Sequence, residues 1–66
     1  MTYMAKMFRS KVEAKAFVEE HGGAFCSNEK GSRTKKDWQI AKAITEMSEE
    51  RATAYPYAVQ WNEKGA

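Results

Sequence analysis

The chain has 66 residues and a formal net charge of +2, from 11 Lys and Arg against 9 Asp and Glu. A chain of this length buries only about 60% of the surface that its unfolded form exposes. It also has too few residues to form the walls of a large active-site cavity. The nearly balanced charge lacks the strong basic excess of a dedicated nucleic-acid-binding protein. No run of 18 apolar residues is present, so we expect no membrane span. We expect one domain over residues 1–66.

The hydrophobic residues have an unusual composition. Leucine is absent, and Ile, Val and Phe together make only 8 of the 66 residues. So low a share is typical of disorder when the net charge is large. Here the net charge is small, and eight aromatic residues and four methionines supply the missing bulk. The composition therefore predicts a folded chain with a core of aromatic and methionine side chains.

One cysteine and one histidine exclude two common means of stabilising a small domain. A single Cys cannot form an intramolecular disulfide, and one Cys with one His cannot complete a four-ligand zinc site. We therefore expect no metal and no cofactor, and a small core of this kind favours self-association. The N-terminus has no apolar stretch typical of a secretory signal. Together with the lone Cys, this predicts a cytoplasmic protein.

The first predicted element is a strand over residues 2–8, which contain no Gly or Pro and are rich in aromatic residues and Met. Tyr3, Ala5 and Met7 would lie on one face of this strand. The other face would carry the remaining residues, which are Thr2, Met4, Lys6 and Phe8.

The second predicted element is a helix over residues 10–21. Ser10 and Glu13 form a capping box at its start. An apolar stripe follows at helical spacing, made by Ala14, Phe17, Val18 and His21. The pair Gly22–Gly23 would end the helix, since glycine adopts the left-handed conformation of a C-cap.

The middle of the chain predicts a short strand, a loop and a second helix. Residues 24–27 form the strand, and the polar residues 28–36 form the loop. A helix over about 35–51 would carry a stripe at i+3 spacing, made by Trp38, Ala41, Ile44 and Met47, with Ile40 and Ala43 beside it. A competing interpretation makes residues 38–41 a strand, but the residue propensities favour a helix.

The last predicted element is a strand that includes residues 55–61. Apolar and aromatic residues alternate with smaller or polar residues there, which is typical of a half-buried strand. Pro56 fits the start of such a strand or an edge position, but not the middle of a central strand. Residues 63–66 would form a tail.

This order predicts a small two-layer α+β domain of the form β-α-(β)-α-β. Two helices would pack on one face of a two- or three-stranded sheet, which buries both helical stripes. Pairing between the first and last strands is left open.

The loop 28–36 is the first candidate site. Its local charge is +3, and it leads into a helix N-terminus, where free backbone N–H groups and the helix dipole favour an anion. The candidate residues for binding an anion or nucleic acid are Lys30, Ser32, Arg33, Thr34, Lys35 and Lys36. The spacing is not that of a P-loop. The simpler interpretation is a solvated loop in which Thr34 only caps the helix.

The aromatic residues of the last strand are the second candidate site. Tyr55, Tyr57 and Trp61 could stack unpaired bases, form a protein interface or fill the core. The core interpretation is favoured, because a chain without leucine needs these rings and Val59 shares their face. If this strand lies at an edge, its backbone could also pair with a strand of a partner.

Catalytic pairs are weak candidates. A His21–Cys26 dyad would need an activated thiolate and a third group to orient the imidazole. Consecutive side chains on a helix point about 100° apart. Neither Glu19–Glu20 nor Glu49–Glu50 therefore forms a two-carboxylate site. We therefore expect that the protein is not an enzyme.

These observations predict a small, non-catalytic protein-interaction module that acts as a homo-oligomer and binds an unidentified protein. The alternative is a nucleic-acid-binding protein that uses the loop 28–36 and the aromatic residues of the last strand. Membrane partners are not expected.

Overall fold

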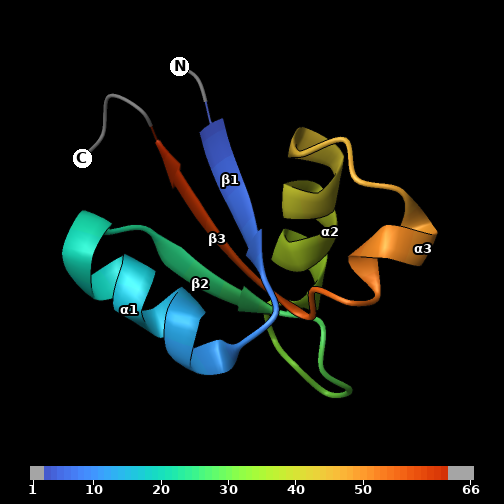
Figure 1. The fold of residues 1–66 in the computed structure, drawn as a ribbon, viewed down its shortest axis with the longest axis horizontal. Helices are drawn as coiled ribbons and strands as arrows, with labels where there is room; N and C mark the ends of the chain where they lie inside the picture. Colours follow the sequence, from blue (N-terminus) through green and yellow to red (C-terminus); the bar gives the residue numbers. More distant parts are fainter. Residues whose placement is uncertain (1–2, 63–66) are drawn as a thin grey trace.

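The computed structural model describes residues 3–62 and has three helices and three strands in this part of the chain (Figure 1). The elements in chain order are β1 (Tyr3–Phe8), α1 (Lys11–His21), β2 (Ala24–Ser27), α2 (Lys35–Ile44), α3 (Glu49–Ala52) and β3 (Tyr57–Asn62). The predicted α+β class is confirmed. The predicted positions of Thr2 and of the tail 63–66 lie outside the described residues.

The strands form one antiparallel sheet in the order β1-β3-β2. The first and last strands therefore pair, with Tyr3 opposite Asn62 and Phe8 opposite Tyr57. The alternative in which the last strand lies at an edge is excluded, because β3 has a hydrogen-bonded neighbour on each side. Pro56 is compatible with this place because it comes directly before the strand and does not interrupt the ladder.

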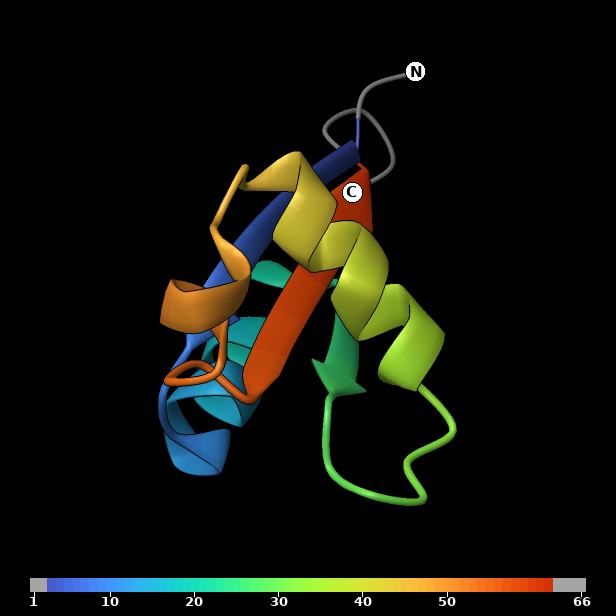
Figure 2. The ribbon, with the colours of Figure 1, turned by 90° about the vertical axis from the view of Figure 1, so that its right-hand side faces the viewer.

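The helices cover opposite faces of the sheet. On one face, Ala14 of α1 packs with Phe8 and Val59. On the other face, Trp38 and Ala41 of α2 pack with Met7, Cys26 and Ala58. Figure 2 shows β3 between the two helices.

This arrangement differs from the predicted placement of both helices on one face. The reason is that side chains alternate along a strand, so neighbours such as Ala58 and Val59 point to opposite faces. Both are fully buried, so each face needs a covering helix. The same alternation confirms the face predicted for the first strand, because Tyr3, Ala5 and Met7 of β1 all lie on the side of α2.

The first helix begins and ends where the sequence predicts. Ser10 is its N-cap, but the Ser10 hydroxyl accepts a hydrogen bond from Val12 N at 3.2 Å rather than from Glu13 N. At the other end, Gly22 has a positive φ of 80°, and its N–H donates to Val18 O at 2.8 Å. Glycine adopts a positive φ without a steric penalty, which is why it ends the helix here.

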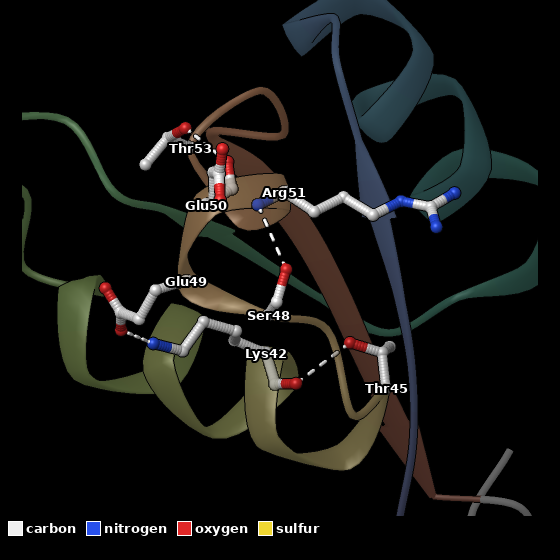
Figure 3. Close-up of polar contacts among 7 residues, drawn as sticks. All are labelled: Lys42, Thr45, Ser48, Glu49, Glu50, Arg51 and Thr53. Carbon is white, nitrogen blue, oxygen red and sulfur yellow. Dashed lines mark hydrogen bonds and ion pairs between the residues drawn. The ribbon is translucent and has the colours of Figure 1, made fainter.

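The predicted helix over 35–51 is wrong in its length, because the chain forms two helices there. Thr45 follows the last residue of α2, and its hydroxyl donates to Ala41 O and Lys42 O, at 3.0 Å each. Glu46 then takes a positive φ of 55°. Ser48 begins α3 by accepting from Arg51 N (Figure 3). The competing strand over 38–41 is excluded, since these residues lie within α2.

Candidate functional site

The loop between β2 and α2 is held by its own hydroxyl groups. Thr34 Oγ1 accepts from Ser27 N at 2.9 Å and lies 3.1 Å from Ser32 Oγ. Ser32 Oγ also accepts from Thr34 N at 3.2 Å. Thr34 makes no side-chain cap on α2, so the simple capping role is wrong. The two predicted anion-binding hydroxyls instead serve the loop itself.

The basic residues of this loop all reach solvent. Lys30, Arg33, Lys35 and Lys36 are exposed, and none forms an ion pair within residues 3–62. The predicted cations are thus exposed, but the accompanying hydroxyls hydrogen-bond within the loop. Binding of an anion by this loop stays a prediction.

The aromatic residues of the C-terminal segment do not form one platform. Tyr57 and Trp61 lie on the α1 face, where the Trp61 ring centroid is 5.1 Å from that of Phe17 and the Tyr57 ring stacks on Phe25 at 5.9 Å. Tyr55 precedes β3 and packs against the cluster on the α2 face. All three are half-buried. Base stacking on Tyr57 or Trp61 would therefore compete with existing ring contacts.

The two residues of the candidate dyad lie on opposite sides of the sheet. His21 is exposed, and its ring centroid is 4.6 Å from that of Phe17 on the α1 face. Cys26 is only 1% exposed and packs with Trp38 and Ala41 on the α2 face. Burial raises the pKa of the Cys26 thiol from 9.0 to about 11, with a further contribution from the charge of Asp37. This environment disfavours a nucleophilic thiolate.

The buried thiol predicts a loss of stability at alkaline pH. Unfolding exposes Cys26, which then ionises near pH 9, while the folded form keeps its proton up to about pH 11. The unfolded state therefore binds fewer protons between these values, and stability falls as pH rises through this window. Relative to Cys26→Ala, we expect the native chain to lose about 2 kcal/mol between pH 8 and pH 11. Urea unfolding of both proteins at the two pH values measures this difference, and an equal decline in both would contradict it.

An apolar groove beside β1 was missed by the sequence analysis. It has a volume of about 510 Å³, and its lining is formed by Tyr3, Asp37, Ile40, Ile44 and Gln60. Tyr3 is 57% exposed and Ile40 is 50% exposed. The only signal in the sequence was that Ile40 lies beside the apolar stripe of α2 rather than on it.

A second, more polar hollow lies where α2 meets α3. Its volume is about 470 Å³, and it is lined by Thr45, Glu46, Met47, Ser48 and Arg51. Near it, Lys42 forms an ion pair with Glu49 (Figure 3). The break between the two helices creates this hollow, so a single long helix over 35–51 could not predict it.

Two further tests bear on the class of protein. Among residues 3–62, no group of three His, Cys, Asp or Glu side chains is placed to hold a metal ion, and no helix is long and apolar enough to cross a membrane. Comparisons with protein-family models, with curated proteins and with solved structures found no match.

Proposed function

We propose that this protein is a non-catalytic protein-interaction module that works as a homodimer. The observation that carries this proposal is a group of exposed large apolar side chains at the N-terminal half of β1. On the α2 face, Tyr3 is 57% exposed and Ile40 of α2 is 50% exposed, and on the opposite face of the same strand Met4 is 38% exposed. Exposed apolar groups of this kind at one end of a strand fit an interaction surface.

A second copy of the chain fits this surface because β1 is an edge strand. The sheet order leaves one side of β1 without a strand partner within residues 3–62. Such an edge offers unpaired backbone groups, and a second antiparallel copy can pair with it about a twofold axis. The pairing would join two three-stranded sheets into one of six strands.

The side chains of β1 select one register for this pairing. A twofold axis at Lys6 would set two like charges directly opposite, which is destabilising. An axis at Ala5 would set Met4 opposite Lys6. An axis at Met4 makes only apolar pairs within residues 3–5, with Met4 opposite Met4 and Tyr3 opposite Ala5. The charge of Lys6 stays clear of this axis because its Nζ lies over the Phe8 ring, 5.5 Å from the centroid.

The small size of the chain gives a reason for such a dimer. A domain of this length is only marginally stable alone, and oligomers commonly add the missing buried surface. Pairing at Met4 would bury Tyr3 and Met4 of both copies. The result is an isologous interface, in which both copies use the same patch.

Sedimentation equilibrium tests the dimer, and we expect a monomer–dimer equilibrium at micromolar protein concentration. Tyr3→Lys introduces a charge into the patch, and we expect it to raise the dissociation constant at least about tenfold, or 1.4 kcal/mol. Val12→Lys is the matched control, because Val12 is 77% exposed but lies on α1. A native chain that stays monomeric at 100 μM, or equal effects of the two variants, would overturn the proposal.

A cysteine variant tests the register. In Met4→Cys the two introduced thiols would lie opposite each other, so mild oxidation should give a disulfide-linked dimer. Lys6→Cys is the control, since the proposed axis separates its two copies by four residues along each strand. Cross-linking of Lys6→Cys but not of Met4→Cys would reject this register.

Nucleic-acid binding remains a second prediction and is less favoured. The basic loop is exposed, but Tyr57 and Trp61 are half-buried in contact with other rings. Stacking of bases on these two rings would require those contacts to be broken.

A further inference from the structure

Two arginines from distant parts of the chain act on one hydroxyl group, Arg9 through a direct hydrogen bond and Arg51 through its effect on the pKa of that group. Arg9, between β1 and α1, donates from Nη2 to the Tyr55 hydroxyl oxygen at 3.2 Å. Its guanidinium carbon also lies 5.0 Å from the centroid of the Tyr55 ring. The pKa of Tyr55 is lowered, first by its hydrogen bond with Arg9 and the charge of Arg9, and then by the same two interactions with Arg51. The positive charges of both arginines therefore stabilise the ionised form of the same hydroxyl group.

No carboxylate balances these two charges in the part of the chain that the structure describes. Neither Arg9 nor Arg51 forms an ion pair within residues 3–62. Of the two acids that directly precede Arg51, Glu49 pairs with Lys42, and Glu50 lies beside Thr53. Figure 3 shows the Arg51 side chain extending in another direction, across β1. A guanidinium has five N–H donors, so most donors of this pair remain available to a ligand.

The backbone around this cluster is fixed by hydrogen bonds. Tyr55 N donates to Ala52 O at 2.9 Å, and Tyr55 O accepts from the buried Trp38 Nε1 at 2.9 Å. Arg51 N donates to the hydroxyl of Ser48 at 3.2 Å. The backbone of Arg51 and Tyr55 is therefore held in place, which reduces the loss of conformational entropy if these residues bind a ligand.

We propose that Arg9, Arg51 and Tyr55 form a binding site for a phosphate monoester group. Guanidinium groups bind phosphate through paired N–H donors, and the tyrosine hydroxyl adds a third direction of hydrogen bonding. A phosphate monoester carries about −1.5 to −2 charges and three acceptor oxygens at pH 7. That charge matches two guanidinium groups, whereas a carboxylate supplies only one negative charge and two oxygens.

This site differs from the anion site predicted on the loop 28–36. The predicted loop site relies on Ser32 and Thr34, whose hydroxyls hydrogen-bond within the loop. In the arginine cluster, by contrast, Arg9 donates directly to the Tyr55 hydroxyl and the charge of Arg51 acts on the same group. The cluster is also separate from the proposed dimer interface. Arg9 follows the C-terminal end of β1, whereas the dimer would form at the N-terminal half of this strand.

A titration with inorganic phosphate tests the site. Arginine side-chain and tyrosine ring NMR signals would be followed at pH 7.5 and constant ionic strength, with chloride as the replaced anion. We expect saturable shifts of the Arg9, Arg51 and Tyr55 signals, with a dissociation constant in the millimolar range. Arg9→Gln and Arg51→Gln should each weaken binding at least tenfold. Arg33→Gln is the matched control, since it removes the same charge from the exposed loop and should change binding less than twofold.

Two further measurements test the role of the Tyr55 hydroxyl and the preference of the site for a phosphate monoester over other anions. Tyr55→Phe keeps the ring and removes the hydroxyl, and we expect binding to weaken severalfold while the fold, checked by circular dichroism, is retained. Phenyl phosphate should bind at least as well as inorganic phosphate, whereas acetate and a single-stranded oligonucleotide of phosphodiesters should bind more weakly at these signals. The proposal is overturned if the shifts do not saturate, if acetate matches phosphate, or if Arg33→Gln weakens binding as much as Arg9→Gln does.

Discussion

Replacing Gly23 with alanine is expected to destabilise the fold by about 3 kcal/mol or more. Gly23 joins α1 to β2 with a φ of +116°, which L side chains rarely adopt. A Cβ at this position would lie 2.8 Å from Gln60 O and 2.9 Å from Val59 Cγ1. The backbone strain and the overlap with β3 each cost about 1–3 kcal/mol. A chain of this length has a total stability of only about 3–10 kcal/mol, so Gly23→Ala should be largely unfolded or close to it.

The neighbouring glycine provides a matched control for this substitution. Gly22 also has a positive φ, +80°, but a Cβ there would meet no atom within 4 Å. Gly22→Ala should therefore cost only the backbone strain, about 1–3 kcal/mol, without the added overlap. Urea unfolding followed by circular dichroism compares the two variants. Equal losses would show that close packing against β3 is not what requires glycine at position 23.

The local elements could be predicted because each has its own signal in the sequence. The period-two pattern predicted that Tyr57, Val59 and Trp61 share a face, which the α1-side cluster confirms. Tyr55 departs from that pattern because Pro56 precedes the strand and the chain turns there. In the same way, Ser10 and Gly22 marked the ends of α1, since capping depends on residues close in sequence.

The placement of the helices on opposite faces could not be predicted in this way. In β3 the alternating positions opposite to Val59 carry Ala58 and Gln60, which are compatible with either a solvent-facing or a buried face. The structure buries Ala58 completely under α2, and Gln60 Nε2 donates to Asp37 O. Small residues such as alanine carry little information on burial, and this chain relies on them in place of leucine.

The surfaces with functional interest depend on contacts that are distant in sequence. Arg9 and Tyr55 are 46 residues apart, and they meet because β1 and β3 pair antiparallel, which sets the end of one strand beside the start of the other. The sequence left the pairing of these strands open, so the meeting of the two side chains could not be derived. The groove at Tyr3 and Ile40 depends on the same strand pairing and on the choice of face for α2.

Trp38→Ala is expected to have the largest effect among the core substitutions, about 4 kcal/mol or more. Trp38 is 3% exposed and lies in the cluster of the α2 face. Its indole Nε1 also donates to Tyr55 O at 2.9 Å, which ties α2 to the segment before β3. Removing a buried Trp side chain costs about 3–5 kcal/mol, and leaving the Tyr55 carbonyl without its donor adds about 1–3 kcal/mol. Against a total stability of about 3–10 kcal/mol, this variant should not fold stably.

Trp38→Phe separates the two contributions, because phenylalanine keeps an aromatic ring but has no N–H donor. We expect a loss of about 2–3 kcal/mol, from the unpaired Tyr55 carbonyl and the smaller ring together. Trp61→Phe is the matched control: Trp61 is half-buried at a ring contact with Phe17, so its loss should stay near 1 kcal/mol. Since the Trp38 hydrogen bond also positions Tyr55, Trp38→Phe should weaken phosphate binding while Trp61→Phe leaves it unchanged. Urea unfolding and the phosphate titration measure both effects, and equal losses in the two variants would show that the indole hydrogen bond contributes little.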